Sequence, residues 1–531
     1  MASPTTGRSP SHDPPALSLA GLSRALDRHR WARLCAFALL LVSASAFQGR
    51  RPLYDPDEGR YVATALEGLE CDEWLIPHLH HEQPHVTKPP LTTWLLAGAI
   101  GLLGRTEAAV RTPAAVAFVL TVLATLGIAR RFAPERAWLA AAIQATMLLP
   151  VAAANVVTPD PLLAGGVALA LHGFAMAWHA GSARARHVAL TVAWASLGVA
   201  FLAKGPPALL PALGFAAFAG LRRGRRGVLA LAWPPALLGF AVLGLGWYVA
   251  ACLRLPGLFS YFVGEEVVGR VATPLHGRNS AWWGSFAVYV PTLLLGTLPW
   301  TGTLLAPLAA PRRAWTALRR RWRDDEGAVL IACCVALPLL VFFVARSRLP
   351  LYLLPLFPTL ALLAGRLASE RLWRARWAGP ALAAWVVVAM TPRWAPGVVP
   401  RHQDARELAR AVETVAGGPL DEIAFVDMTP RYGLAFYVDV EVERVELGPE
   451  PERLWDGRPV EALAAELEVP EGRRLFAART RRIHRVDAAL AGTRFFRRHA
   501  AAVQDLTLFW LEPADPRGRP AAGALRSVER R

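Results

Sequence analysis

Residues 312–345 read RRAWTALRRRWRDDEGAVLIACCVALPLLVFFVA, a cluster of arginines followed by a long apolar stretch. The apolar part, residues 327–345, is long enough to cross a bilayer as a helix, which takes roughly 17–25 residues. The same alternation of basic clusters and apolar runs recurs from about Trp31 to Met390. This pattern indicates an integral membrane protein of many spans.

The composition supports this interpretation. The chain has 531 residues, of which 54% are hydrophobic, and its mean hydropathy is positive, which is unusual for a soluble protein. A net charge of +17 raises the alternative of nucleic-acid binding, but the arginines punctuate the apolar runs, as membrane topology requires. We therefore expect no nucleic-acid partner. The five cysteines show no CxxC or zinc-finger spacing, so neither a disulfide framework nor a structural zinc site is indicated.

The apolar segments predict a mainly α fold, a polytopic transmembrane helix bundle with about 11–13 spans. The candidate spans are 31–47, 110–129, 137–153, 161–179, 188–203, 205–221, 227–250, 283–305, 327–345, 349–365 and 377–392. The apolar stretch Leu91–Leu103 is too short for a typical crossing and is expected to be re-entrant or interfacial.

The basic clusters decide the topology. If Leu91–Leu103 does not cross, all strong clusters fall on one side, which the positive-inside rule makes cytoplasmic. These clusters are Arg24 to Arg33, Arg130 to Arg136, Arg184 with Arg186, Arg222 to Arg226, Arg312 to Arg323, and Arg366 to Arg376. The N-terminus is then cytoplasmic. The segments expected outside are 48–109, 154–160, 203–206, 251–282, 346–348 and everything after residue 392.

Three regions are predicted along the chain. Residues 1–30 are expected to be a disordered cytoplasmic tail, because they are rich in Ser, Pro and Arg. Residues 31–392 form the transmembrane domain, with large outer loops at 48–109 and 251–282, and its first run is expected to be a retained signal anchor. Residues 393–531 are predicted to be a soluble extracytoplasmic α/β domain. The stretches that indicate it are a helical run near Ala405–Val415 and alternating runs at Glu422–Asp427, Leu434–Val440 and Leu506–Leu511.

Polar groups at the ends of membrane helices are costly and are therefore functional candidates. The first cluster is Tyr54-Asp55-Pro56-Asp57-Glu58-Gly59-Arg60-Tyr61. A helix start with Asp55 as N-cap and Glu58 closing a capping box accounts for those two acids. The capping box leaves Asp57 unexplained. On a helix, Asp57 shares one face with Arg60 and Tyr61. We favour an active site on this face over a surface ion pair.

A second cluster contains Lys88, which precedes two prolines and an apolar run at the expected membrane interface. There it could bind a lipid phosphate as a point charge, and ordinary interfacial snorkelling is an equal alternative. The histidines 78, 80, 81 and 85 that precede it match no standard metal-ligand spacing. No cofactor is therefore predicted, and a divalent metal remains a minor alternative.

Further candidates follow at other helix ends. They are Asp160, Lys204, Glu266 with Arg270 and His276, and Arg348 with Tyr352. Each has a structural alternative: a helix cap for Asp160, an anchor for Lys204, a loop salt bridge for Arg270 and a positive flank for Arg348. All of them nevertheless fall on the same outer face as Asp57 and Lys88. Carboxylates and cations gathered between apolar helices suit an anionic lipid headgroup, whose departing phosphate the cations would stabilise, while a carboxylate serves as a base.

The ordered motifs resemble those of the aminoarabinose transferases and protein O-mannosyltransferase-like glycosyltransferases of the GT-C type. They are Asp57 to Tyr61, Asp72 to Pro77, Lys88-Pro89-Pro90-Leu91, Thr158-Pro159-Asp160, Lys204-Gly205-Pro206 and Arg348 to Pro355, within roughly residues 31–370. The resemblance implies an inverting, metal-independent transferase that uses a polyprenyl-phosphate sugar on the periplasmic side.

The resemblance also implies roles for single residues. Asp57 and Asp160 correspond to the catalytic candidates, and the lipid-phosphate ligands correspond to Arg60, Lys88, Arg270, Arg348 and Tyr352. We add Lys204 to the phosphate ligands for its place on the same face, and we expect Glu58, Tyr61, Glu266 and His276 around them. Two departures, Thr87 in place of a usual Glu and Arg348 in place of a commoner Lys, indicate a relative and not the same enzyme.

The sequence thus predicts a multi-pass glycosyltransferase of a bacterial inner membrane. It would move one sugar, a hexose or pentose, from a polyprenyl-phosphate donor to an envelope acceptor, which is a lipid A-like lipid, a glycan or a protein. The alternatives are a lipid-linked glycan ligase or polymerase and, from another class, a lipid flippase or transporter. A transporter predicts internal repeats and charges near the bilayer midplane, whereas no duplicated halves are visible and these candidates lie at the ends of spans.

Overall fold

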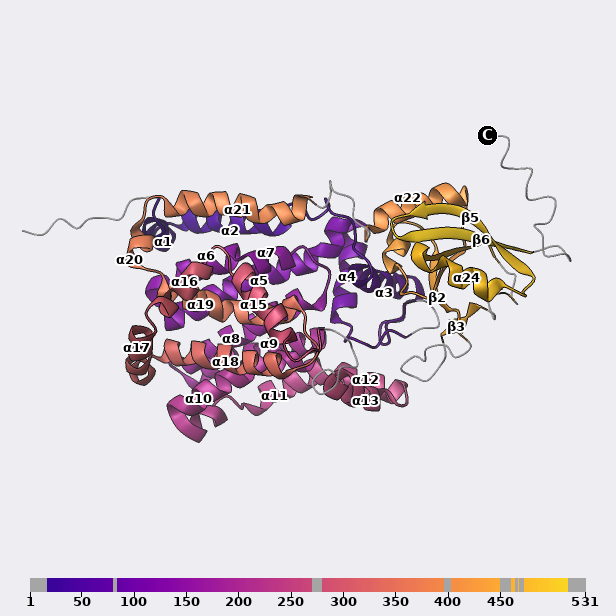
Figure 1. Cartoon of the computed structure of the whole chain (residues 1–531). Helices are drawn as coiled ribbons and strands as arrows, with labels where there is room; N and C mark the ends of the chain where they lie inside the picture. Colours follow the sequence, from indigo (N-terminus) through magenta and orange to yellow (C-terminus); the bar gives the residue numbers. More distant parts are fainter. Residues whose placement is uncertain are drawn as a thin grey trace, which may run out of the picture.

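Figure 1 shows the computed structural model, a bundle of helices with a smaller α/β domain at one end. The structure describes residues 17–79, 84–269, 279–395, 403–448, 460–463, 467 and 472–513. The predicted fold class, a polytopic helix bundle with a small C-terminal α/β domain, is confirmed.

The bundle follows the predicted spans closely. Its helical segments are α2 (Arg30–Ser45), α5 (Glu107–Phe132), α6 (Ala137–Thr146), α7 (Leu148–Ala153), α8 (Pro159–Trp178), α9 (Ala183–Lys204), α10 (Leu209–Leu229), α11 (Pro234–Phe240), η3 (Ala241–Leu245), α12 (Gly246–Arg254), α15 (Gly284–Gly296), α16 (Thr301–Leu305), η5 (Ala306–Ala309), α18 (Glu326–Val344), η6 (Pro350–Leu356), α19 (Phe357–Leu367) and α21 (Ala378–Trp394).

Within the described ranges, six helices are long and apolar enough to cross a membrane, and seven if the bent pair Gly284–Gly296 and Thr301–Ala309 is one span. Shorter apolar helices such as α2, with 16 residues, and α21, with 17, fall below that length. The total of 11–13 spans therefore stays a prediction.

Helices α8 and α9 pack closely because α8 presents glycine to its neighbour. A Cβ added at Gly173 would lie 2.7 Å from the backbone nitrogen of Ala193, so only glycine fits there. Small residues of this kind drive helix association in lipid, where burial alone offers little gain. The two helices follow one another as a hairpin, and the packing therefore brings the start of α8, with Asp160, beside the end of α9, with Lys204.

Several short elements lie at the end of the bundle nearer the C-terminal domain, where Figure 1 labels α3, α4 and α13. They are α3 (Asp57–Cys71), α4 (Leu91–Leu103), η2 (Pro206–Ala208), α13 (Leu258–Tyr261) and η4 (Phe262–Gly269). Helix α4 has 13 residues, as its apolar run predicted, and it shares a buried cluster with α3, α5 and the C-terminal domain. The elements that carry most of the candidate residues thus meet at one end of the bundle.

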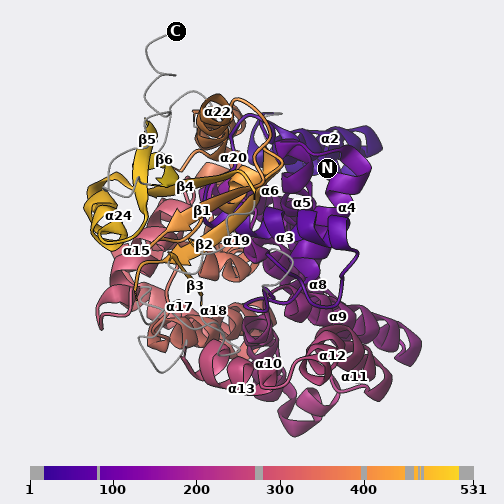
Figure 2. The same cartoon turned by 90° about the vertical axis from the view of Figure 1, so that its right-hand side faces the viewer.

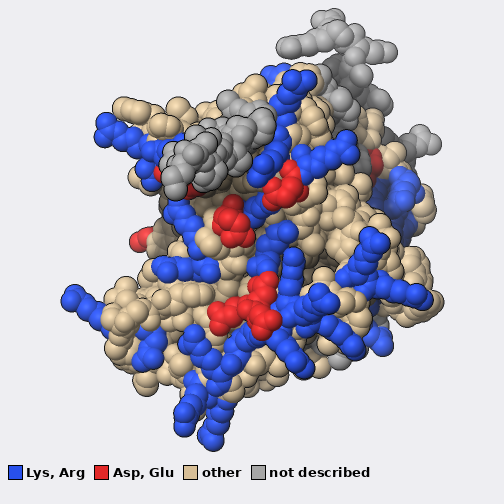
Figure 3. Space-filling view, turned by 90° about the vertical axis from the view of Figure 1, so that its left-hand side faces the viewer, with Lys and Arg blue, Asp and Glu red and all other residues tan. Residues whose placement is uncertain are grey.

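The opposite end is strongly basic. It carries α1 (Leu19–Arg28), η1 (Pro134–Arg136), α17 (Pro311–Asp324) and α20 (Glu370–Arg374). Figure 3, which looks onto this end, shows many Lys and Arg side chains and few acids. Helix α1 corrects the prediction that residues 1–30 are a disordered tail: Ser18 caps it by accepting a hydrogen bond from the Gly21 N–H at 3.0 Å, and Leu19 packs into a buried cluster. Residues 1–16 lie outside the described residues.

The C-terminal domain is built on one mixed sheet. Its elements are α22 (Ala405–Ala416), β1 (Glu422–Val426), η8 (Tyr432–Phe436), β2 (Glu441–Glu446), β3 (Glu461–Ala462), β4 (Arg474–Arg479), η9 (Thr480–Arg482), α24 (Ile483–Leu490), β5 (Phe495–Val503) and β6 (Leu506–Pro513). The strand order is β3-β2-β1-β4-β6-β5, with β1 parallel to both β2 and β4, and β6 antiparallel to both β4 and β5. Helices α22 and α24 cover opposite faces of the sheet, which Figure 2 shows in front of the bundle.

The strand expected at Leu434–Val440 was wrong, because residues 432–436 form the 3-10 helix η8. Apolar residues alternate there because they are buried against two different neighbours, and not because they line one face of a sheet. Leu434 packs into the core of the C-terminal domain, whereas Phe436 packs against α3 and α4. Element η8 lies so close to α3 that a Cβ on Gly59 would overlap the backbone nitrogen of Gly433.

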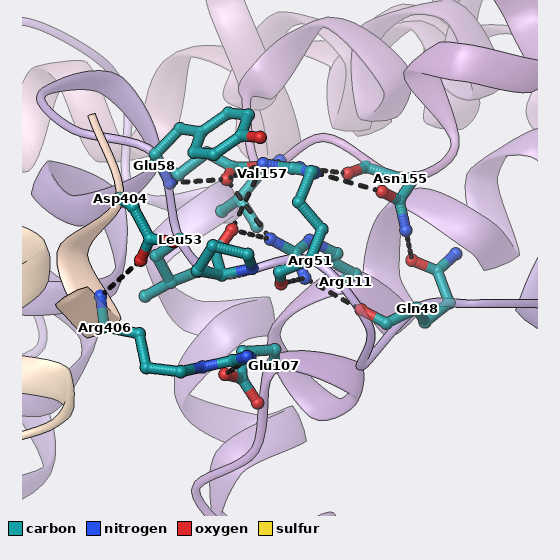
Figure 4. A network of polar contacts seen from close by, with 12 residues as sticks. Gln48, Arg51, Leu53, Glu58, Glu107, Arg111, Asn155, Val157, Asp404 and Arg406 are labelled. Atoms are coloured by element: carbon teal, nitrogen blue, oxygen red, sulfur yellow. Dashed lines mark hydrogen bonds and ion pairs between the residues drawn. The ribbon is translucent and has the colours of Figure 1, made fainter. Parts of the chain in front are cut away.

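A buried ionic network fixes the start of α3 (Figure 4). The two terminal nitrogens of the Arg51 guanidinium donate to the two carboxylate oxygens of Glu58, at 2.6 Å each. Arg111 of α5 donates to the same carboxylate at 3.3 Å, and the backbone N–H groups of Tyr54 and Val157 donate to it at 3.0 Å each. The Glu58 carboxylate therefore joins three segments that are far apart in sequence.

Carbonyl and amide groups complete the network. Arg111 donates to the backbone oxygens of Gln48, Arg51 and Pro52 at 2.7–2.9 Å. Arg51 donates to the backbone oxygen of Asn155 at 2.6 Å, and the Asn155 amide donates to Gln48 at 2.7 Å. These bonds give most of the buried polar groups of the network a hydrogen-bond partner, which a buried ion pair requires to be stable.

The predicted capping box at α3 was wrong. The helix begins at Asp57, and Asp55 does not cap it but accepts a hydrogen bond from the Gly433 N–H in the C-terminal domain at 2.8 Å. Glu58 is committed to the two arginines. Burial alone would raise its pKa, but Arg51 and Arg111 lower that pKa to about 2, so the carboxylate is charged at neutral pH.

We expect Glu58→Gln to destabilise the protein by about 3 kcal/mol, because it leaves two buried arginines without their shared counter-ion. Thermal unfolding of the purified protein at pH 7 measures this loss. The difference from the wild type should shrink as the pH falls from 4.5 towards about 2, because the stabilisation of a carboxylate with a lowered pKa is lost over that window. Glu70→Gln, at an exposed position of the same helix, is the control. Equal unfolding temperatures for the two variants would contradict the network's structural role.

Candidate functional site

The candidate site lies where helix ends meet beneath the C-terminal domain. Asp160, in the first turn of α8, forms an ion pair with Lys204, the last residue of α9, and their side chains are only 7% and 9% exposed. The Lys204 ammonium also lies 4.1 Å from the centre of the Tyr352 ring in η6. Three residues predicted from separate motifs are therefore in one cluster.

The predicted face of α3 points at this cluster. Burial raises the pKa of the Tyr61 hydroxyl above its usual range, Arg60 lowers it, and the nearby charges of Asp160 and Asp57 raise it further. Tyr61 is thus close enough to both carboxylates to be affected by their charges. Asp57 itself is exposed at the first position of α3, where a bound molecule can reach it.

Lys88 and Glu266 form a second cluster. Their ion pair is 2.8 Å long and both side chains are 14% exposed. His85 connects this cluster to α3: burial, Arg60 and Lys88 lower the pKa of its imidazole to about 3, against the opposing effect of Glu266. His85 is therefore neutral at physiological pH. It is the shared electrostatic neighbour of Arg60 and Lys88.

Arg348 has a structural contact that the sequence did not reveal. Its guanidinium is buried and donates to the backbone oxygens of Asn279 and Ala281, at 2.7 Å each, just before α15. The side-chain amide of Asn279 donates back to the Arg348 carbonyl at 3.0 Å. These bonds hold the start of α15, and the role of Arg348 in binding phosphate stays a prediction.

Some predicted residues lie outside the described residues, namely His80, His81, Arg270 and His276. In the part of the chain that is described, no three His, Cys, Asp or Glu side chains are placed to hold a metal ion together. The expectation that the protein needs no cofactor is thus still a prediction.

Arg51 and Arg111 are the important residues that sequence reasoning missed. Arg111 lies inside the predicted span 110–129, and an ionisable residue inside a span is itself a functional or structural signal. Arg51 offered no such signal, because its partner Glu58 had been assigned to a local cap.

The arrangement can bind an anion and support displacement chemistry. Lys88 and Lys204 each form an ion pair with a carboxylate. Such a partner stabilises a cation in a mostly buried site until the phosphate of a ligand replaces the carboxylate. Arg60 lies next to both clusters. Cations aimed at a phosphate and an accessible carboxylate are the groups required to stabilise a leaving group and to accept a proton.

Comparison with known proteins gives a consistent result. The family of dolichyl-phosphate-mannose-protein mannosyltransferases matches residues 87–248. The undecaprenyl phosphate-alpha-4-amino-4-deoxy-L-arabinose arabinosyl transferase 2 of Sodalis glossinidius is 32% identical over 340 residues, which is 63% of this chain and 59% of that protein. Its namesake in Pseudomonas fluorescens is 30% identical over 350 residues, or 65% and 60% of the two chains. The matched stretch thus spans about three fifths of these relatives.

The fold has a close counterpart among solved structures. The crystal structure of ArnT from Cupriavidus metallidurans bound to undecaprenyl phosphate matches with a TM-score of 0.72 and 21% identity, over 91% of this chain and 98% of that chain. The apo state of the same protein also has a TM-score of 0.72, with 20% identity. The resemblance indicated by the motifs is confirmed: in sequence and in fold, the chain is similar to the polyprenyl-phosphate sugar transferases of the GT-C type.

Proposed function

We propose that the protein is a glycosyltransferase that moves a single sugar from a polyprenyl-phosphate donor to an acceptor of the bacterial envelope. The observation that supports this proposal is a set of two mostly buried ion pairs, Lys204 with Asp160 and Lys88 with Glu266. The relatives named as undecaprenyl-phosphate transferases support the donor class.

The donor's phosphate would bind to the cations, with its lipid tail along the apolar helices. Arg60, Lys88 and Lys204 then neutralise the negative charge that grows on the phosphate as its bond to the anomeric carbon breaks. The ion pairs of Lys88 with Glu266 and of Lys204 with Asp160 hold the two lysines in place, so little reorganisation is needed when the donor arrives. Polyprenyl phosphate leaves as the product.

The acceptor attacks the anomeric carbon from the opposite side, which inverts its configuration. If the acceptor group is a hydroxyl, Asp57 takes up its proton as the new carbon–oxygen bond forms. If the acceptor group is a phosphate, no base is needed and Asp57 orients the attacking oxygen. The acceptor is a lipid A-like lipid, a glycan or a protein, and a site at the helix ends is within reach of a membrane-borne headgroup.

The location proposed is a bacterial inner membrane. The basic end of the bundle in Figure 3 would face the cytoplasm, following the positive-inside rule, and would place the N-terminus there. The site and the C-terminal domain would then face the periplasm. No metal or other cofactor is part of the proposed chemistry.

Asp57→Asn should lower turnover by a factor of about 10² or more if Asp57 is the base, because general base catalysis contributes about that much. Binding of the polyprenyl-phosphate sugar should change little. The measurements are transfer of a radiolabelled sugar and donor binding, both with the protein in lipid nanodiscs. Glu70→Gln again serves as the control. Normal transfer by the Asp57→Asn variant would exclude both proposed roles of this carboxylate, and normal lipid translocation without any sugar transfer would favour a flippase.

Lys88→Met should raise the Kd for the donor at least about tenfold, the equivalent of about 1.4 kcal/mol. Lys88→Arg should retain part of the affinity because it keeps the charge. The decisive comparison is Glu266→Gln, which releases Lys88 from its ion pair at 2.8 Å. If Lys88 binds phosphate, this variant keeps or improves donor affinity. If the pair is only structural, Glu266→Gln weakens donor binding and thermal stability as much as Lys88→Met does.

A further inference from the structure

A crevice lies at the carboxyl ends of the parallel strands in the C-terminal domain. Strand β1 is between β2 and β4, and it is parallel to both. The chain leaves β1 towards β2 on one side and later returns to β4 on the other, so the loops after β1 and β4 diverge. In α/β sheets this is the position where ligands usually bind.

Two adjoining cavities occupy this position. One has a volume of about 400 Å³ and reaches from Arg479 and Arg481, after β4, to Asp55 of the membrane domain. The other, of about 310 Å³, extends towards Arg444 on β2. They share Met428, Thr429 and Arg479 as lining residues. We call the two cavities together the carboxyl-end crevice; each has a volume suited to a small ligand.

The crevice carries an excess of positive charge. Five arginines line it, namely Arg431, Arg444, Arg479, Arg481 and Arg482. Three of them are in ion pairs: Arg431 with Asp505 at 3.0 Å, Arg444 with Glu446 at 2.6 Å and Arg482 with Asp427 at 3.5 Å. As far as the described residues show, Arg479 and Arg481 are in no ion pair. A guanidinium without a carboxylate partner is well suited to bind a phosphate with two parallel hydrogen bonds.

Asp55 supplies a second and different feature. It is 2% exposed, and its Oδ1 accepts the hydrogen bond from Gly433, whereas its Oδ2 is buried without a hydrogen-bond partner among the described residues. Nearly all buried polar groups in native proteins are paired, so an unpaired carboxylate oxygen calls for an explanation. A donor on a ligand, such as a sugar hydroxyl or amine, would satisfy it.

We propose that the carboxyl-end crevice binds the headgroup of the acceptor, a saccharide that carries a phosphate group. Arg479 and Arg481 bind the phosphate, and Asp55 accepts a hydrogen bond from the saccharide. The assignment to the acceptor rests on the proposed function. Asp55 and Pro56 line the crevice and directly precede the candidate catalytic Asp57, so the crevice reaches the start of the helix that carries this residue. We therefore assign the crevice to the acceptor, on which Asp57 acts in the proposed reaction.

Binding of simple probes tests the crevice without any turnover. The full-length protein in nanodiscs is titrated with glucosamine 1-phosphate, with glucosamine and with inorganic phosphate, by calorimetry. Glucosamine 1-phosphate should bind more tightly than either fragment, and Arg479→Ala/Arg481→Ala should weaken its binding at least tenfold. The matched control is Arg494→Ala/Arg498→Ala beside the edge strand β5, and thermal unfolding confirms that both double variants are folded. Equal affinity of the two double variants would overturn the proposal.

A second comparison separates the two features of the crevice. Asp55→Asn should weaken binding of glucosamine 1-phosphate and leave inorganic phosphate unaffected, because Asp55 is assigned to the saccharide. A lipid-anchored diglucosamine phosphate should bind more tightly than its deacylated form. Equal affinity of these two would indicate a soluble sugar phosphate and would contradict the acceptor role.

Kinetics then distinguish failure of this inference from failure of the proposed function. With the lipid-anchored acceptor, Arg479→Ala/Arg481→Ala should raise the KM for the acceptor at least tenfold, with donor affinity unchanged and kcat close to that of the wild type. An unchanged acceptor KM would reject the crevice while the transferase stands. If the wild type transfers no sugar but the probes still bind at the arginines, the transferase fails and the anion site remains.

Discussion

Glu58 and its two arginines are the interaction on which the rest of the site depends. The carboxylate lies between Arg51 and Arg111 and also accepts the backbone N–H of Val157, so it joins the entry to α3, the start of α5 and the loop before α8. The junction adds charged hydrogen bonds to the apolar cluster that packs α3 against α4 and α5. Asp57, the residue that precedes Glu58, makes no hydrogen bond or ion pair with another described residue, so the packing of its helix determines its position.

The helical architecture could be predicted because the bilayer restricts which structures can span it. In a bilayer only helices and closed barrels satisfy their backbone groups, so apolar runs and basic clusters together define spans and their direction. For the same reason Asp57, Asp160, Lys204 and Tyr352 could be assigned to one end of the bundle before their contacts were known. The ion pair of Lys204 with Asp160 and the contact of Lys204 with the Tyr352 ring agree with that assignment.

What could not be predicted depends on contacts between distant parts of the chain. Asp55 and Glu58 have the spacing of a local capping box, but their real partners are Gly433 and two arginines up to 53 residues away. The apolar alternation near Leu434 suggested a strand, although it arises from packing on two different neighbours. Local patterns of this kind are ambiguous whenever a segment is buried between domains, because periodicity records burial and not the identity of the partner.

The close approach of α3 and η8 has a consequence for how the two domains can evolve. Gly59 and Gly433 meet backbone to backbone, and the Asp55 carboxylate lies against both of them, so neither glycine has space for a side chain. An exchange of the C-terminal domain with that of a distant relative would therefore fail unless the incoming domain offered the same bare surface at the same place. The helix bundle and the C-terminal domain differ in architecture, yet evolution can exchange them only as a matched pair.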